Sequence, residues 1–277
     1  MDAHTNAFRE FELAGWNDAG ISKRYDADLG SVTAQSVPAL LDAAVVRPGA
    51  RVLDVATGAG HAAAAAARLG AEATGIDFSA VQIRLAHERH PGVRFEVADA
   101  AALPFDAQRF DAVVSSFGML HFPDPDAAAR EAFRVLKPGG RLAFTVWDAP
   151  DRTVALGALL GAIRRHGTLD VGLPAGPGFF QFSEPAACER LLRGAGFEAL
   201  VIAQVTQVWR VPSPDAAFDT LLHATVRTRA MLLAQTHEAI ERIRAAMHEA
   251  LAPYRRDDGY ELPMPAVLAS AARPATD

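Results

Sequence analysis

The sequence predicts an α/β domain built on a mostly parallel sheet with helices on both faces. Short runs of branched apolar residues alternate with helical segments between residues 51 and 147, a pattern typical of parallel sheets. The first run, 52–55, ends in a loop that contains Gly58 and Gly60, and an Ala-rich segment follows it directly. Glycines in such a loop let the backbone touch a ligand that a side chain would keep away.

The composition favours one large domain and disfavours several classes of function. The 277 residues are 50% hydrophobic, enough for a full core. The net charge of −6 argues against a protein whose main task is binding nucleic acid. Cys188 is the one cysteine of the sequence, which excludes a disulfide within the chain and disfavours a cysteine metal site. We therefore expect no metal centre.

The ends and apolar runs of the sequence predict a cytoplasmic protein. Residues 1–12 are mixed and charged, without the apolar centre of a signal peptide. No run approaches the roughly 18 consecutive apolar residues that a membrane span requires. We expect no membrane and no nucleic acid among the partners, and a homodimer is left open.

The expected elements follow from periodicity and from start and stop signals. Residues 1–30 predict one or two short helices, and 31–46 an amphipathic helix that Arg47-Pro48-Gly49 ends. Ser79 suits the N-cap of the second helix of the alternation, and Pro125 the first turn of the third. The expected strands are 51–56, 72–77, 93–98, 110–116 and, after a turn at 137–140, 141–147; the helices are 60–69, 79–89 and 126–136.

The pattern loosens after Trp147. A Gly-, Pro- and Phe-rich loop is expected at 167–182, and Ser213-Pro214-Asp215 is a favourable helix start. The remaining expected elements are helices at 153–166 and 183–194, a strand at 198–210, two helices within 215–252 that break near Gln235, and a last strand at 264–271.

Acidic residues end two consecutive expected strands. Asp77 lies 19 residues after Gly58 (77 − 58), where a carboxylate can accept hydrogen bonds from both ribose hydroxyls of a nucleotide. Asp99 ends the next strand, where it can accept from an adenine amino group. Both would lie at the carboxyl edge of a parallel sheet, where such folds bind ligands.

With these residues the sequence resembles the class I S-adenosylmethionine-dependent methyltransferases, in particular the ubiquinone/menaquinone-biosynthesis-like small-molecule group (methyltransferase type 11). Five segments resemble the family's motifs in order and at family spacing. They are 52–60 (VLDVATGAG), 75–79 (GIDFS), 98–105 (ADAAALPF), 110–116 (FDAVVSS) and 134–142 (RVLKPGGRL).

The resemblance implies a Rossmann-like, seven-stranded, mostly parallel sheet whose last strand is antiparallel. The whole chain, 1–277, would be a single methyltransferase domain. Its parts would be an N-terminal helical lid at 1–46, a cofactor-binding core at 47–148, and an acceptor-side half at 149–277 with a helical cap insertion at 213–258.

The resemblance also implies S-adenosyl-L-methionine as cofactor. The glycine loop would approach its methionine part, Asp77 would hold the ribose, Asp99 and Ala100 the adenine, and Phe78 would flank the adenine ring. Asp54 lies near the methionyl ammonium in this family, or accepts from backbone N–H groups of the loop. The expected cofactor residues are Asp54, Thr57, Gly58, Ala59, Gly60, Asp77, Phe78, Asp99, Ala100, Ser116, Phe117 and Tyr25.

Methyl transfer to a small-molecule acceptor would proceed by in-line displacement, helped by proximity and desolvation. His121 is the candidate general base, because an imidazole suits proton removal near neutral pH; its alternative is a histidine that packs near the cofactor without acting as a base. The expected acceptor-site residues are Trp16, Trp147, Phe179, Phe180, His223, Arg227 and Met231, with Phe182 and His237 as further candidates.

Two other functions stay open at this point. Gly58-Ala59-Gly60-His61-Ala62-Ala63 fits the relaxed fingerprint of nicotinamide-dependent oxidoreductases, although the chain has no Tyr-x-x-x-Lys pair for hydride chemistry. A protein that binds the cofactor without methylating an acceptor is the other. Methylation of nucleic acid or protein amides is disfavoured, because Ser115-Ser116-Phe117-Gly118 stands where those enzymes carry Asn/Asp-Pro-Pro-Tyr.

Overall fold

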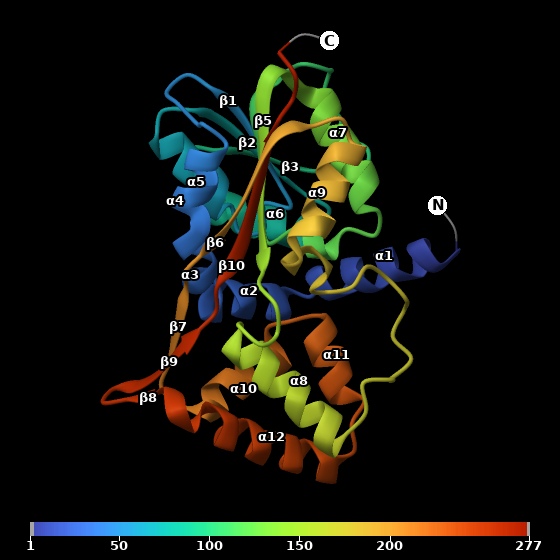
Figure 1. The fold of residues 1–277 in the computed structure, drawn as a ribbon, viewed down its shortest axis with the longest axis vertical. Helices are drawn as coiled ribbons and strands as arrows, with labels where there is room; N and C mark the ends of the chain where they lie inside the picture. The colour runs from blue at the N-terminus through green and yellow to red at the C-terminus, as the bar shows by residue number, and fades with distance from the viewer. Residues whose placement is uncertain (1–2, 276–277) are drawn as a thin grey trace.

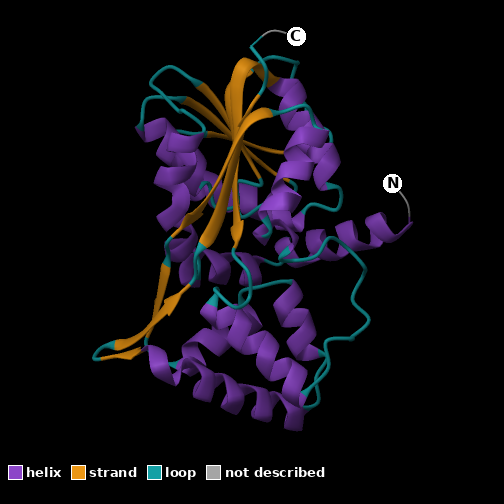
Figure 2. Ribbon diagram, viewed as in Figure 1, coloured by secondary structure: helices purple, strands orange, loops and turns teal. Residues whose placement is uncertain are grey.

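The computed structural model describes residues 3–275, and its centre is a seven-stranded sheet with helices on both sides (Figures 1 and 2). All strands run parallel except β10, which lies antiparallel between β5 and β6. This confirms the predicted α/β class and the antiparallel last strand. In spatial order the strands are β3 (Arg94–Val97), β2 (Glu72–Asp77), β1 (Arg51–Val55), β4 (Phe110–Ser116), β5 (Leu136–Trp147), β10 (Ala266–Ala272) and β6 (Glu198–Val205).

The sheet is buried between two helical layers. The central strands carry continuous apolar runs, as expected for parallel strands covered on both faces. In Figure 1, α4 and α5 lie on one side of the sheet, and α7 and α9 lie on the other. The covering helices are α4 (Val37–Ala43), α5 (His61–Arg68), α6 (Ala80–Arg89), α7 (Pro125–Val135) and α9 (Pro185–Gly194).

Local signals start several helices where the sequence predicts them. The Ser79 hydroxyl accepts from the backbone N–H of Gln82 and caps α6. Asp124 caps α7, and Pro125 occupies its first turn, where the missing N–H costs nothing. Ser213 caps α10 in the same way. These caps are short-range, so the residues on either side are enough to specify them.

A second group of helices and a small sheet lie beside the carboxyl edge of the main sheet. Helix α8 packs on α12, and α10 packs on α11, α12 and α2. The hairpin β8–β9 extends away from the main sheet (Figure 1). These elements are α8 (Val154–His166), α10 (Pro214–His223), α11 (Arg227–Leu233), α12 (His237–Leu251), β7 (Val208–Val211), β8 (Arg255–Arg256) and β9 (Gly259–Pro263).

The N-terminal helices run between the main sheet and this second group (Figure 1). They are α1 (Ala3–Trp16), α2 (Ala19–Asp28) and α3 (Gly30–Thr33). Four single turns of 3-10 helix complete the description: η1 (Ala34–Ser36), η2 (Met119–His121), η3 (Gln181–Ser183) and η4 (Ala252–Tyr254). No helix among residues 3–275 is long and apolar enough to cross a membrane.

The expected bounds of two elements, one near the N-terminus and one in the centre of the chain, were wrong. The single helix expected at 31–46 is divided into α3, η1 and α4, because Pro38 starts a new helix in its first turn. Strand β5 begins at Leu136 rather than at 141. Leu136 pairs with Phe110, the next residues bulge outward, and Arg141 then pairs with Ala112. The expected turn is therefore an interruption within a strand.

Two C-terminal expectations also needed correction. The strand expected at 198–210 is broken at 206–207, because β6 pairs with β10 in the main sheet whereas β7 pairs with β9 in the small one. Three helices, not two, occupy 215–252. The extra break lies at Thr225, whose hydroxyl donates to the Leu221 carbonyl and accepts from the Arg229 N–H, taking over bonds that a helix would make.

A glycine pair in α8 gives a test of this packing. A Cβ at Gly157 would collide with the Pro150 carbonyl oxygen, whereas a Cβ at Gly161 would meet open space. We expect Gly157→Ala to lower the free energy of unfolding by about 1–2 kcal/mol, since overpacking outweighs the gain in helix propensity. Gly161→Ala, the matched control, should raise it by up to about 1 kcal/mol. Urea unfolding measures both, and equal effects would contradict the close approach of Pro150.

Candidate functional site

The loop between β1 and α5 takes a backbone path that needs glycine. Gly58 and Gly60 have φ of +55° and +86°, in the left-handed region that residues with a Cβ avoid. A Cβ at Gly60 would also lie 2.7 Å from the Phe95 ring. The predicted glycine loop is therefore present, at the carboxyl edge of the sheet. It lines a cavity together with Thr57, Ala59, Ser116 and Phe117, all expected there.

Asp54 is buried directly beneath this loop. Its Oδ2 accepts from the Thr57 hydroxyl at 2.6 Å and from the Ala63 backbone N–H at 3.0 Å. Its Oδ1 has no hydrogen-bond partner in the described protein. Burial raises the pKa of this carboxyl to about 7. One oxygen thus supports the loop from below, and Asp54 itself lies outside the lining of the cavity.

Asp77 joins the same loop from the end of β2. Its Oδ2 accepts from the Gly58 N–H at 3.0 Å, and its Oδ1 accepts from the Ser79 N–H at 2.9 Å. Burial raises the pKa of Asp77 to about 6, although these backbone bonds oppose the shift. Its neighbour Phe78 also lines the cavity, as expected. A carboxylate held by fixed backbone donors has little freedom to move, so its position at the cavity is set by the fold.

Asp99 and Ala100 line an adjoining cavity on the far side of Asp77 and Phe78. Asp99 accepts from the Ala101 N–H through Oδ1 and pairs with Arg9 of helix α1 through Oδ2, at 3.0 Å. Sequence reasoning missed Arg9. A single arginine in an N-terminal helix has no local feature that assigns it to an acid 90 residues later.

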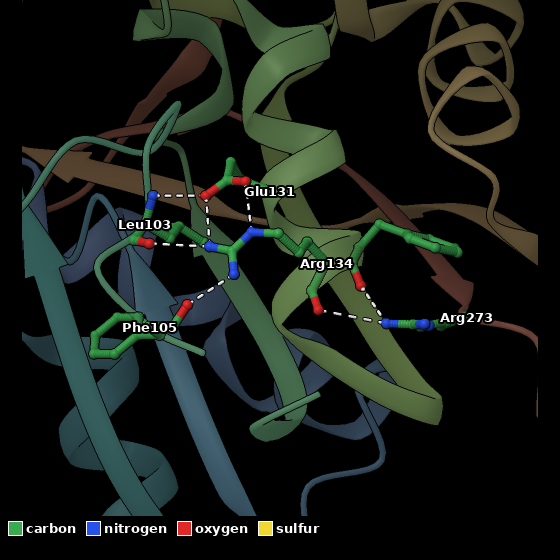
Figure 3. Close-up of polar contacts among 6 residues, drawn as sticks. Leu103, Phe105, Glu131, Arg134 and Arg273 are labelled. Carbon is green, nitrogen blue, oxygen red and sulfur yellow. Dashed lines mark hydrogen bonds and ion pairs between the residues drawn. The ribbon is translucent and has the colours of Figure 1, made fainter. Parts of the chain in front are cut away.

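The loop that carries Asp99 is anchored from behind by helix α7. Arg134 donates to the carbonyls of Leu103 and Phe105, while Glu131 accepts from the Leu103 N–H and pairs with Arg134 (Figure 3). The hydrogen bond from Arg134 holds the pKa of Glu131 below its usual value. Arg273 in turn donates to the carbonyl of Arg134 (Figure 3). The loop is thereby fixed by side chains rather than by strand pairing.

A third cavity, which we call the apolar cavity, lies between the N-terminal helices and the second helical group. Trp16, Tyr25 and His121 line both the apolar cavity and the cavity at the glycine loop. Its other lining residues are Leu29, Trp147, Leu156, Phe179, Leu221, Thr225, Val226, Arg227, Thr228 and Met264. The two cavities therefore meet at His121.

The expected acceptor-site residues divide into two groups. Trp16, Trp147, Phe179 and Arg227 lie around the apolar cavity, where the structure brings together residues from all parts of the chain. The others lie outside its lining: His223 and His237 are exposed, Met231 is half-buried on α11, Phe180 stacks edge-on against Phe179, and Phe182 is buried against Phe144.

His121 makes its closest polar contact with a residue that the sequence did not single out. Its Nδ1 lies 2.9 Å from Oε2 of Glu12, which is fully buried. Glu12 also accepts from the Trp16 indole N–H and from the Arg227 guanidinium. The spacing from Glu12 to Trp16 places the two on one helix face, but no sequence signal connects Glu12 with His121, 109 residues away.

The chain resembles proteins of known family over part of its length. Residues 53–144 match a family model described as a methyltransferase domain. The demethylmenaquinone methyltransferase of Renibacterium salmoninarum is 40% identical over 111 residues, which are 40% of this chain and 47% of that protein. An uncharacterized protein of Mycobacterium tuberculosis is 36% identical over 133 residues, 47% of each chain. The chain spans about half the length of the curated relatives it matches.

Solved structures resemble nearly the whole chain. The phosphoethanolamine N-methyltransferase 2 of Haemonchus contortus, solved with S-adenosyl-L-methionine, gives a TM-score of 0.59 at 21% identity, over 96% of this chain and 60% of that chain. The 4+2 cyclase SpnF gives 0.58 at 22% identity, over 95% and 97% of the two chains. At these identities the likeness shows the fold, which is the Rossmann-like fold of class I methyltransferases.

Proposed function

Since residues 53–144 of this chain match a family model described as a methyltransferase domain, we propose that the chain transfers a methyl group from S-adenosylmethionine to a small-molecule acceptor. The observation that carries the proposal is the meeting of two cavities at His121, one at the glycine loop and one lined by apolar side chains. A cofactor held in the first would present its reactive end to an acceptor held in the second.

The residues around the glycine loop fit the proposed cofactor. Gly58 and Gly60 leave room for close approach of the ligand to the backbone. Asp77 is a buried acceptor for ribose hydroxyls, while Asp54, outside the lining of the cavity, supports the loop from below. Asp99 and Ala100 would hold the adenine, in a cavity that adjoins Phe78.

The apolar cavity favours an acceptor with a flat, apolar ring. Its walls include Trp16, Trp147 and Phe179, whose side chains offer large apolar faces. Its lining residues with polar groups include Tyr25, His121, Arg227 and two threonines. Relatives of this chain are named demethylmenaquinone methyltransferases, which agrees with a ring-containing acceptor.

Three contributions from the protein would drive the transfer. The two cavities hold the reactants in line, which supplies on the order of 7–11 kcal/mol. The buried site excludes water, so the loss of charge in the reaction is not opposed by solvation. Bound S-adenosylmethionine supplies an electrophilic methyl group. For a hydroxyl acceptor, Nε2 of His121 would accept the hydroxyl proton.

Calorimetric titration with S-adenosylmethionine, S-adenosylhomocysteine and NADH tests the cofactor class. We expect micromolar binding of the first two and none of NADH. Binding of NADH alone would support an oxidoreductase instead, which the methyltransferase match disfavours. The 4+2 cyclase with the same fold suggests a second candidate function: an enzyme that catalyses a reaction other than methyl transfer. Anaerobic incubation with 1,4-naphthoquinol and simple phenols, with S-adenosylhomocysteine release as readout, separates the two.

A further inference from the structure

We propose that Glu12, on helix α1, is a positioning residue that holds His121 in the tautomer able to accept a proton. His121 is then in that tautomer only when α1 lies over the sheet. The inference rests on the base role proposed above for His121. Glu12 was not expected at the site, and its carboxylate does not line the cavities that His121 lines.

The surroundings of Glu12 keep it ionised although it is buried. The fully buried carboxylate is surrounded by three donors: the Trp16 indole at 3.0 Å, the imidazole of His121 at 2.9 Å and the Arg227 guanidinium at 2.5 Å. Burial by itself raises the pKa of Glu12, but the charges and hydrogen bonds of His121 and Arg227 outweigh it, so its pKa lies below its usual value. An ionised carboxylate can only accept hydrogen bonds.

The ionised carboxylate decides which nitrogen of His121 carries the proton. Because Glu12 has no proton to donate, Nδ1 of His121 must be the donor of their shared hydrogen bond. In the neutral imidazole the lone pair then lies on Nε2. His121 lines the cavity at the glycine loop and the apolar cavity, so Nε2 is the nitrogen left for the acceptor.

Arg227 supplies the counter-charge that this arrangement requires. It is nearly buried, and it also donates to the carbonyls of Pro177 and Leu120, which fix the guanidinium in place. Glu12 and Arg227 together carry no net charge, and Arg227 stays charged whatever the protonation state of His121. A proton that His121 accepts is then stabilised by the adjacent carboxylate. Asp77 is a second acidic group that interacts electrostatically with His121.

The three partners come from segments that only the folded chain brings together. Glu12 lies on α1, His121 follows β4 and Arg227 begins α11. Helix α1 is held near its middle by the Arg9–Asp99 ion pair and at its C-terminal end by the Ser79 hydroxyl, which donates to the Trp16 carbonyl. Seating of α1 over the cofactor cavities therefore delivers Glu12 to His121. The proton acceptor would be assembled in the same step that covers the reactants.

Nitrogen-15 NMR of histidine-labelled protein, with and without S-adenosylhomocysteine, tests the inference. His121 resonances are assigned by their loss in His121→Ala. We expect wild type to carry the proton on Nδ1, and Glu12→Gln to lose this preference, because its amide can donate to Nδ1. Glu10→Gln is the matched control: it removes the same charge from an exposed position of α1 and should leave the His121 spectrum unchanged.

Two outcomes would overturn the inference. A wild-type protein with the proton on Nε2 would do so without any variant, which keeps the test decisive if Glu12→Gln does not fold. An Nδ1 proton that persists in Glu12→Gln would also do so. Failure of the proposed function looks different: absence of cofactor binding or of methyl transfer, in a wild-type protein whose His121 carries the Nδ1 proton, contradicts the function and supports the positioning role.

Discussion

Replacement of His121 by alanine is expected to lower kcat for methyl transfer by about 10²–10⁴-fold, the usual contribution of a general acid or base. The affinity for S-adenosylhomocysteine should stay within about threefold of wild type, because the groups proposed to hold the cofactor are Asp77, Asp99 and the glycine loop rather than the imidazole. Steady-state kinetics, with an acceptor found among 1,4-naphthoquinol and the simple phenols, measures kcat. Calorimetry on the same preparations measures the affinity for S-adenosylhomocysteine.

The control for this variant is His223→Ala. His223 is exposed on α10 and lies outside the lining of the three cavities that form the site, so its loss should leave kcat unchanged. Removal of the imidazole leaves Glu12 with its bonds to Trp16 and Arg227, and thermal unfolding should show the fold intact. Wild-type turnover in His121→Ala would mean that His121 packs at the site without acting as a base.

Asp77→Ala is expected to weaken cofactor binding by about 1–3 kcal/mol, or roughly 5- to 150-fold in Kd. The variant removes a buried charged acceptor that the Gly58 and Ser79 N–H groups hold in place. Those two donors lose their partner as well, so the loop loses support along with the ribose. Calorimetric titration with S-adenosylhomocysteine measures the change, and Asp42→Ala, on the exposed side of α4, is the control.

The pH dependence of binding gives a second readout for the same residue. With a pKa raised by burial to about 6, Asp77 is protonated below that pH and is then a poorer acceptor. Affinity in wild type should therefore rise as the pH increases from about 5 to 7. In Asp77→Asn, which cannot ionise, this rise should be reduced. Equal Kd values in wild type and Asp77→Ala across that range would remove Asp77 from the ribose site.

The alternation of strands and helices between residues 51 and 147 could be predicted because each element carries its own signal. Buried parallel strands are continuous apolar runs, and the caps at Ser79 and Asp124 depend on residues within one turn. The errors lie where a distant partner decides. The strand breaks after β6 because β7 pairs with β9. No sequence signal near residue 206 indicates that this partner strand lies more than 50 residues later.

The candidate site divides in the same way. Asp54, Gly58, Gly60 and Asp77 could be identified because the loop's positive-φ glycines and the strand-end acids are local requirements of one turn. Phe180, His223 and Met231 were expected at the acceptor site from their place in the sequence, yet they lie outside the lining of the apolar cavity. Which face of a cap helix meets the cavity depends on how that helix packs, and a sequence pattern does not specify this packing.

The sequence by itself therefore determined the sheet, the glycine loop and the acids at the strand ends, since each needs particular residues within a few positions. Only the tertiary structure decided what surrounds His121. Glu12 and Arg227, 215 positions apart, form one buried ion pair, and a charge pair of this kind has no short-range signature. Its members are recognisable only once folding removes them from water, because burial is what makes each carboxylate and guanidinium require its partner.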